Sequence, residues 1–314
     1  MKRCSRQAAA LSWILVLLSL LGSGSPAFAT GGGLAALEKR VAALERQVNA
    51  LTAENASLRA DLAVVQKNSV LALNGRLKLT QHNGYKTALF TGVNVQVVNG
   101  LGKTDTLNGL GNLIVGYNAP REGAYELWEV CSKGEYHNQA KCEANRGVWA
   151  VNHKSGSHNI VGGDNNAYSS VGGLVVGFDN VINGRFASVS AGRDNSASGF
   201  VSSASGGWYN RAWVDYGSVC GGYGNKTSGL FSSVSGGYYN EARGDFSGVS
   251  GGFDNTATGN LSSVTGGFGN TARGELSGVS GGNGVTAIGE YSWAAGKLCQ
   301  PGPGGSCQVN PRPR

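Results

Sequence analysis

The sequence predicts a β-solenoid of fifteen-residue repeats, preceded by an α-helical coiled coil. Three observations carry this prediction: a recurring glycine, an asparagine three residues after it, and a heptad pattern of apolar residues near the N-terminus. The glycines are Gly162, Gly177, Gly192, Gly207, Gly222, Gly237, Gly252, Gly267 and Gly282. The asparagines are Asn165, Asn180, Asn195, Asn210, Asn225, Asn240, Asn255 and Asn270. A fixed period indicates stacked repeats, so the 52 glycines of the chain do not indicate disorder.

The first 29 residues have the three parts of a secretory signal peptide. A basic segment at 1–7 precedes an apolar segment at 8–21, and small residues at Ala27 and Ala29 favour cleavage after Ala29. The alternative is an uncleaved membrane anchor, but the apolar segment is short for a bilayer span. We therefore expect a secreted or surface-displayed protein whose mature chain begins at Thr30.

The charge of the chain gives little support to a nucleic-acid partner. The net charge of +7 falls to about +4 when Lys2, Arg3 and Arg6 of the leader are left out. No segment is dense in lysine and arginine. We expect no nucleic-acid partner.

Residues 30–67 form the predicted coiled coil, because their apolar residues are spaced alternately by three and four. The series is Leu34, Leu37, Val41, Leu44, Val48, Leu51, Asn55, Leu58, Leu62 and Val65. So narrow a stripe favours self-association over packing on the chain's own domain. Valine at a, leucine at d and Asn55 at an a position favour a parallel dimer. The segment from Arg40 to Glu45 instead resembles a trimer-specifying pattern, and we favour the trimer because the repeats also favour association.

Two regions separate the predicted coiled coil from the repeats. Residues 68–118 show alternating segments, including 87–90 and 93–98, and turn signals, which predicts a small β region that caps the solenoid. Residues 119–155 then interrupt the pattern and form an insert. His137 and His153 of the insert lack the spacing of a zinc site, so we expect solvated histidines and no metal.

Cysteines close in sequence predict two local disulfides in an exported chain. The expected pairs are Cys131 with Cys142, within the insert, and Cys299 with Cys307. Cys220 is left over and occupies a serine position of the repeat, so we expect it to be a small buried substitute. An intermolecular bridge is the alternative.

Residues 156–296 hold the repeats, and reading them at fifteen-residue spacing reveals three columns. The valine column comprises Leu174, Val189, Ala204, Val219, Val234, Val249, Val264, Val279 and Ala294. The small-residue column comprises Ile182, Ala197, Ala212, Thr227, Ala242, Ala257, Ala272 and Ala287. The third column comprises Phe186, Val201, Tyr216, Phe231, Phe246, Leu261, Leu276 and Tyr291. Each rung is predicted to hold two short strands, while the spacing leaves open which columns face inward.

Turns are expected at Gly-Gly-x-x-Asn and at Gly259 and its equivalents, where glycine permits positive φ and tight corners. The asparagines can stack amide on amide, or serve as turn formers in each rung. Nine rungs at about 4.8 Å predict a rod on the order of 43 Å long. Its core is thin, so we expect side-by-side association that buries the third column. Residues 297–314 are expected to form a C-terminal tail.

The columns also resemble a known family. The repeat pattern Ser-Val-Ser-Gly-Gly-x-x-Asn-Thr-Ala-x-Gly resembles the head repeat of trimeric autotransporter adhesins of the YadA-like type, and residues 249–252 and 257–259 carry the match. The resemblance covers 156–296 and implies a left-handed β-roll in an adhesive trimer. The period is fifteen where that family has fourteen, the coiled coil precedes the repeats, and 301–314 lack the alternation of membrane β-strands. Anchoring by autotransport is therefore not implied.

The sequence contains no motif that combines a nucleophile or an acid and base, so we expect no enzyme and no cofactor. Asp179, Asp194 and Asp254 share a turn position, but they lack the nine-residue period of calcium-binding repeats. The ligand-contact candidates are the aromatic residues after the second glycine: Phe178, Trp208, Tyr223, Tyr238, Phe253 and Phe268. Packing within the turn or between subunits is the alternative role.

We therefore expect a structural or adhesive protein that displays repeated turns from a coiled-coil oligomer to an extracellular glycan or matrix protein. One alternative is a carbohydrate-processing β-solenoid enzyme, for which Asp179, Asp194 and Asp254 are the candidates. The other is a structural fibre without a ligand.

Overall fold

The computed structural model describes residues 31–67, 73, 75–121, 129–133, 136, 138–301 and 307–309. The predicted signal peptide at 1–29 lies outside the described residues. The chain divides into two compact units, 1–94 and 95–314. Within the described part, no helix combines the length and apolar character needed to cross a membrane.

The first unit contains a long helix and a hairpin. Helix α2 (Gly31–Gln66) spans 36 residues and covers the heptad segment. Strands β1 (Leu77–His82) and β2 (Tyr85–Phe90) pair antiparallel. Asn83 and Gly84 join them with φ values of 50° and 83°, the paired positive φ of a tight hairpin turn. The turn signal in the sequence is thereby explained.

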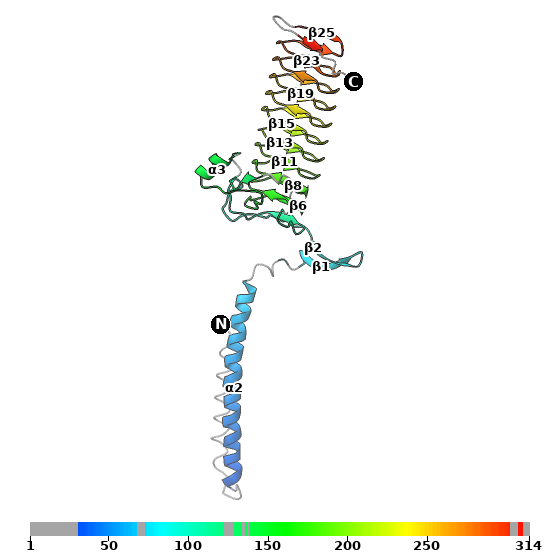
Figure 1. Ribbon diagram of the computed structural model, residues 1–314. Coiled ribbons are helices and arrows are strands. Elements are labelled where there is room, and N and C mark those ends of the chain that lie inside the picture. The colour runs from blue at the N-terminus through cyan, green and yellow to red at the C-terminus, as the bar shows by residue number, and fades with distance from the viewer. Residues whose placement is uncertain are drawn as a thin grey trace. The chain divides into compact units, whose positions relative to one another are not determined.

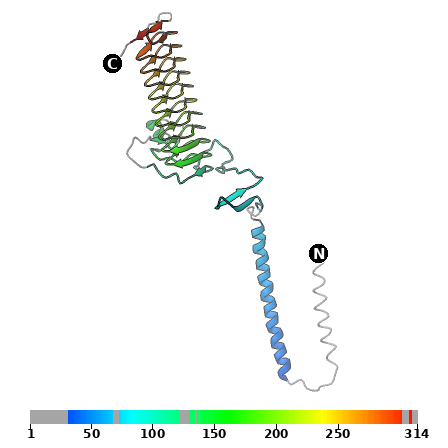
Figure 2. The same ribbon diagram turned by 90° about the vertical axis from the view of Figure 1, so that its right-hand side faces the viewer.

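The second unit is mostly a β-solenoid of about nine turns, stacked in Figures 1 and 2 from β6 to β25. Its valine sheet, as described, has 12 strands: β3 (Leu113–Val115), β6 (Ile160–Asp164), β8 (Leu174–Phe178), β10 (Ser188–Val189), β12 (Ser203–Ala204), β14 (Ser218–Val219), β16 (Ser233–Val234), β18 (Gly248–Val249), β20 (Ser263–Val264), β22 (Gly278–Val279), β24 (Trp293–Ala295) and β25 (Leu298–Gln300). Neighbouring strands are parallel up to β24, as expected when each rung repeats the one before it.

A second sheet, the alanine sheet, faces the first. Its 10 described strands are β7 (Ala167–Tyr168), β9 (Val181–Ile182), β11 (Ser196–Ala197), β13 (Arg211–Ala212), β15 (Lys226–Thr227), β17 (Glu241–Ala242), β19 (Thr256–Ala257), β21 (Thr271–Ala272), β23 (Val285–Ala287) and β26 (Cys307–Val309). Apart from Leu174, residues of the valine column and the small-residue column meet between the sheets, where their exposure is 0–1%. The structure thus decides which columns face inward.

The first rungs are one residue shorter than the rest, which corrects the expected columns. Val175, and not Leu174, pairs with Val189 and points inward at 0% exposure. The missing residue is the first glycine of Gly-Gly: Val175-Val-Gly-Phe-Asp-Asn stands where later rungs read Val-Ser-Gly-Gly-x-x-Asn. By the same shift Asn166 takes the column position expected for Asn165, since its amide oxygen accepts from the backbone N–H of Asn180.

Glycine serves a different purpose at each of the two turns. Gly252 has a φ of 87°, and a Cβ there would lie 2.3 Å from the Gly267 carbonyl oxygen. Gly259 does not have positive φ, but a Cβ there would lie 1.9 Å from the Gly274 oxygen. Positive φ at this second turn falls two residues later, on Leu261 at 57°. The expectation that Gly259 supplies the positive φ is therefore wrong: it permits close approach of the rungs.

The buried asparagines form a continuous ladder between rungs. Each side-chain oxygen accepts from the backbone N–H of the next member at 2.7–3.0 Å, and that of the last accepts from Val285: Asn118, Asn166, Asn180, Asn195, Asn210, Asn225, Asn240, Asn255 and Asn270. The side-chain nitrogen of Asn240 donates to the carbonyl oxygens of Gly236 and Gly252, both at 2.9 Å. Most hydrogen bonds of the ladder therefore join a side-chain amide to a backbone group of a neighbouring rung. Hydrogen bonds between two side-chain amides, which amide-on-amide stacking predicts, are not its main interaction.

Both ends of the solenoid carry additional strands. Strand β3 pairs in parallel with β6, so the segment at 113–115 covers the first rung. At the other end, β25 and β26 pair antiparallel with β24 and β23. The expected C-terminal tail thus contains two strands that cover the sheet edges. Residues 93–98, expected as a strand, form none because they pair with no neighbouring strand.

Candidate functional site

The six predicted ligand-contact residues lie in one row along the glycine turn. We call the row that joins Phe178, Arg193, Trp208, Tyr223, Tyr238, Phe253 and Phe268 the glycine-turn ladder; successive members pair through single parallel bridges. Five of its aromatic side chains are 39–49% exposed, and Tyr223 is half-buried. The structure therefore brings all six candidates together on the surface.

Ring stacking makes most of this ladder continuous. Ring centroids are separated by 4.7 Å between Tyr223 and Tyr238, 5.1 Å between Tyr238 and Phe253, and 5.0 Å between Phe253 and Phe268. Trp208 meets Tyr223 edge to face at 5.2 Å. Offset stacking and edge-to-face contacts both suit aromatic quadrupoles, so the rings restrict one another while one side of each stays in solvent.

Arg193 continues the ladder where the aromatic series is broken. Its guanidinium carbon lies 5.2 Å from the Phe178 ring centroid and 5.7 Å from that of Trp208. A guanidinium over an aromatic face is attracted by the ring quadrupole. The sequence alone showed Arg193 as an interruption, because it does not show which rings lie on either side.

The third column forms a second row, the corner ladder: Phe186, Val201, Tyr216, Phe231, Phe246, Leu261, Leu276 and Tyr291. All eight have φ between 54° and 59° and are 40–58% exposed. Positive φ costs a bulky side chain about 1–3 kcal/mol. Contacts along the row offset this strain, with Tyr216 and Phe231 stacked at 4.4 Å and Phe231 and Phe246 at 5.0 Å. An apolar strip therefore runs along this corner of the solenoid.

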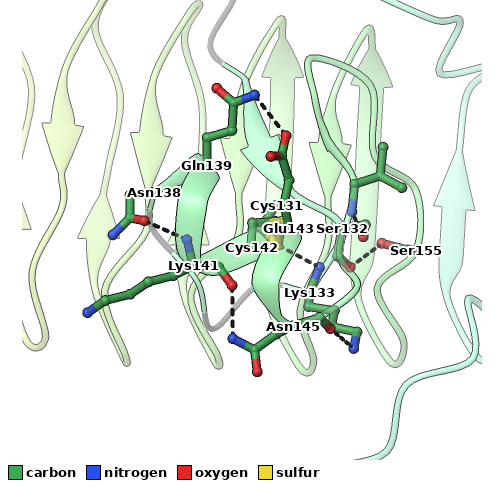
Figure 3. Close-up of a disulfide and its surroundings, with 11 residues drawn as sticks. Cys131, Ser132, Lys133, Asn138, Gln139, Lys141, Cys142, Glu143, Asn145 and Ser155 are labelled. Atoms are coloured by element: carbon green, nitrogen blue, oxygen red, sulfur yellow. Dashed lines mark hydrogen bonds between the residues drawn. A yellow bond between two sulfur atoms is a disulfide. The ribbon is translucent and has the colours of Figure 1, made fainter.

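The insert is a small disulfide-bonded clasp (Figure 3). Strands β4 (Val130–Cys131) and β5 (Trp149–Ala150) pair antiparallel, and helix α3 (Gln139–Ala144) lies between them in the chain. Cys131 and Cys142 form a disulfide that joins β4 to α3. The Asn138 side chain caps α3 by accepting from the backbone N–H of Lys141 at 2.8 Å. This arrangement keeps the clasp compact although its apolar core is small.

A buried arginine fastens the beginning of the insert to the solenoid. The Arg121 side chain is fully buried, and its Nε lies 3.6 Å from the Asp179 carboxylate while its Nη2 lies 3.9 Å from that of Asp194. Burial lowers the pKa of Arg121, and the two carboxylates oppose this effect. Burial likewise raises the pKa of Asp179, with Arg121 opposing. Two of the three predicted turn aspartates thus take part in docking the insert.

The histidines near the insert are less solvated than expected. His153 is 8% exposed, and burial lowers its pKa. His158 is half-buried: its Nε2 accepts from the Asn99 backbone N–H at 3.1 Å, and its Nδ1 lies 2.9 Å from the Thr104 carbonyl oxygen. Solvated loop residues are therefore the wrong description for His153, because the solenoid packs against the insert. His137 lies outside the described residues.

The remaining cysteines differ in their environments. Cys220 is free and exposed, so the expected burial is wrong. It follows the inward-facing Val219, and alternation along the strand turns its side chain outward. Cys299 is disulfide-bonded. The side chain of Cys307 lies outside the described residues, so their pairing remains a prediction.

The geometry defines the second unit as a β-solenoid with two exposed side-chain ladders and a docked clasp. Among the residues that the structure describes, no group of three or more histidines, cysteines and carboxylates is placed to hold a metal ion. No protein-family model matches this sequence, and comparison with the curated proteins finds no match. The two ladders and the insert are therefore the candidate functional surfaces of this unit.

Proposed function

We propose that this protein is a secreted or surface-displayed structural or adhesive protein without catalysis. Several copies, three in our preferred arrangement, present the glycine-turn ladder to an extracellular glycan or matrix protein. The observation that carries this proposal is the ladder itself. It combines exposed aromatic rings, a fixed spacing set by the rungs, and a rigid scaffold.

Aromatic rings held in this way suit weak, repeated recognition. Trp and Tyr are favoured at binding surfaces because they offer large contact areas with little loss of side-chain freedom. Stacking between Tyr223, Tyr238 and Phe253 already restricts their rings, so binding costs less entropy. Linked copies turn later contacts into intramolecular ones, which raises avidity by about 10²–10⁴ when the geometry permits.

Two surfaces support self-association. In α2 the apolar residues of the heptad series are 46–61% exposed in the single chain, from Val41 at the low end to Leu34 at the high end. A second and third copy of the helix bury this seam and place Arg40 beside Glu45 of a neighbour. The corner ladder offers a further apolar strip for side-by-side packing of solenoids. The resemblance to trimeric adhesin heads agrees with this arrangement and with a left-handed coil.

The enzymatic alternative is less well supported by the described residues. Asp179 and Asp194 both pair with the buried Arg121, which gives them a structural role. Asp254 lies in the glycine turn five rungs beyond Asp179, a separation that prevents the three from acting on one bond.

We expect the mature chain from Thr30 to sediment with three times the protomer mass, and a chain without residues 30–67 to lose most of this association. Leu51→Asp places a charge in the seam, whereas Ala53→Asp places it on the opposite face of α2 and serves as the matched control. We expect Leu51→Asp to dissociate the oligomer and Ala53→Asp to leave it intact. A monomeric mature chain contradicts the proposed assembly, and a dimer contradicts its stoichiometry.

We expect the oligomer to bind at least one component of a glycan and matrix-protein array. Tyr238→Ala combined with Phe253→Ala removes two neighbouring ladder rings, and we expect at least a ten-fold loss of binding because buried aromatic anchors dominate such surfaces. Leu230→Ala is the control, since Leu230 is 44% exposed but outside both ladders. If the folded oligomer binds nothing above background, the adhesive role is wrong and a structural fibre is the better description.

A further inference from the structure

A second candidate site, separate from the glycine-turn ladder, lies between the insert and the alanine sheet on which it packs. It is a cleft of about 350 Å³. The insert contributes Glu129 and Trp149, and the sheet contributes Asn183, Ser196, Ser198 and Trp213. Its volume lies in the range of small-molecule sites, about 300–1,000 Å³. Val130 of β4 packs with Ala167 and Val181 beside the cleft, so the insert is held on the sheet by its own apolar contact.

Asn183 points to a ligand because it is buried without a partner for its side-chain oxygen. It directly follows β9, at a position that is open to solvent in later rungs such as that of Arg243. Here the insert covers it, and its exposure falls to 2%. Its Oδ1 has no hydrogen-bond partner. Buried acceptors are nearly always satisfied, so this oxygen is suited to accept from a hydroxyl or an N–H of a bound molecule.

The rest of the cleft combines aromatic faces with short polar groups. Ser196 and Ser198 share a hydrogen bond between their hydroxyls at 3.2 Å, which uses one hydroxyl hydrogen and leaves the other to donate. Trp149 and Trp213 are half-buried and supply broad apolar surfaces from opposite sides, and Glu129 supplies an exposed acceptor. A pyranose sugar needs this combination, since it has hydroxyls around its edge and an apolar C–H face.

Charge around Trp213 argues against a cationic ligand. The Lys226 ammonium lies 4.4 Å from its ring centroid, and the Arg211 guanidinium carbon lies 5.3 Å away. Two tryptophans and a carboxylate would otherwise suit an ammonium ligand. Lys226 and Arg211 already interact with the indole of Trp213, however, and their positive charges repel a further cation. We infer that the cleft between insert and alanine sheet binds the pyranose unit of a carbohydrate, stacked on Trp149 and hydrogen-bonded to Asn183.

To test the inference, the mature, disulfide-bonded chain is titrated with methyl glycosides of glucose, galactose, N-acetylglucosamine and glucuronic acid. Binding is measured by calorimetry and by tryptophan fluorescence. The decisive variant is Asn183→Leu, which removes the acceptor without shrinking the side chain much. We expect at least a ten-fold weaker affinity for the bound glycoside, with a melting temperature equal to or above that of the unaltered protein. Trp149→Ala is expected to weaken binding by a similar factor, and Glu129→Gln less.

Trp208→Ala is the matched control, because it removes an exposed tryptophan from the glycine-turn ladder and leaves the cleft unchanged. We expect it to bind the glycoside as the unaltered protein does. The inference is overturned if none of the four glycosides binds saturably, or if Asn183→Leu binds normally. A lower melting temperature for Asn183→Leu also overturns it, since it assigns that oxygen a structural role. Loss of binding in Trp208→Ala alone moves the sugar to the ladder.

Discussion

Val249→Asp is expected to unfold the rungs around β18, whereas Val201→Asp is expected to leave the solenoid intact. Val249 is 1% exposed in the interior between the two sheets, and the other members of its buried cluster are valines and alanines. A carboxylate placed there is either desolvated or protonated at a cost of several kcal/mol. Because each rung is stabilised mainly by its neighbours, the damage should spread to the adjacent rungs.

The control introduces aspartate at Val201, a valine that is exposed where Val249 is buried. Val201 is 44% exposed on the corner ladder and has a φ of 55°. Aspartate tolerates this left-handed conformation better than a β-branched residue, so stability should stay the same or rise. Thermal unfolding gives the stability difference, and hydrogen exchange shows which rungs open. If the two variants melt alike, the inward assignment of the valine column is wrong.

Asn240→Ala is expected to lower the free energy of unfolding by about 2–6 kcal/mol. Asn240 is 0% exposed, and its loss removes the partner of the Asn255 backbone N–H and of the Gly236 carbonyl oxygen. The Gly252 oxygen keeps its bond from the Tyr238 backbone N–H at 2.9 Å. One buried donor and one half-buried acceptor are thus left without their partner, and each costs about 1–3 kcal/mol.

Asn283→Ala provides the comparison. Asn283 is exposed and stands at the position of the glycine-turn ladder, so it lies outside the buried asparagine ladder. We expect its change in stability to stay within about 0.5 kcal/mol, as for most surface substitutions. Urea unfolding of both variants gives the values. Equal effects at the two positions show that the asparagines act only as turn formers, each within its own rung.

Much of the solenoid was predictable because its bonds repeat with the sequence. Val219, Val234 and Val249 recur at fifteen-residue spacing, and each pairs with its equivalent in the next rung. Each rung contacts only its neighbours, and these have nearly the same sequence. The contacts of one repeat therefore describe those of the whole stack. The pairing of Cys131 with Cys142 was equally predictable, since the two cysteines have a sequence separation of only 11.

The candidate site was predictable only in part. The period placed Tyr238, Phe253 and Phe268 in one row, but it did not show their stacking or how Arg193 bridges two rings. The cleft at Asn183 left no signal in the sequence. Its position in the repeat predicts an exposed side chain, and only the docked insert buries it.

The amino-acid sequence was enough to predict a solenoid with glycine turns, an asparagine at each turn, and a heptad segment before it. These features depend on residues that are near in the chain or repeated at a fixed spacing. The shorter first rungs, the outward side of Cys220, and the burial of Arg121 and Asn183 under the insert became visible only in the folded chain. Burial is set by whatever packs over a residue, and here that is a segment without the period of the repeat.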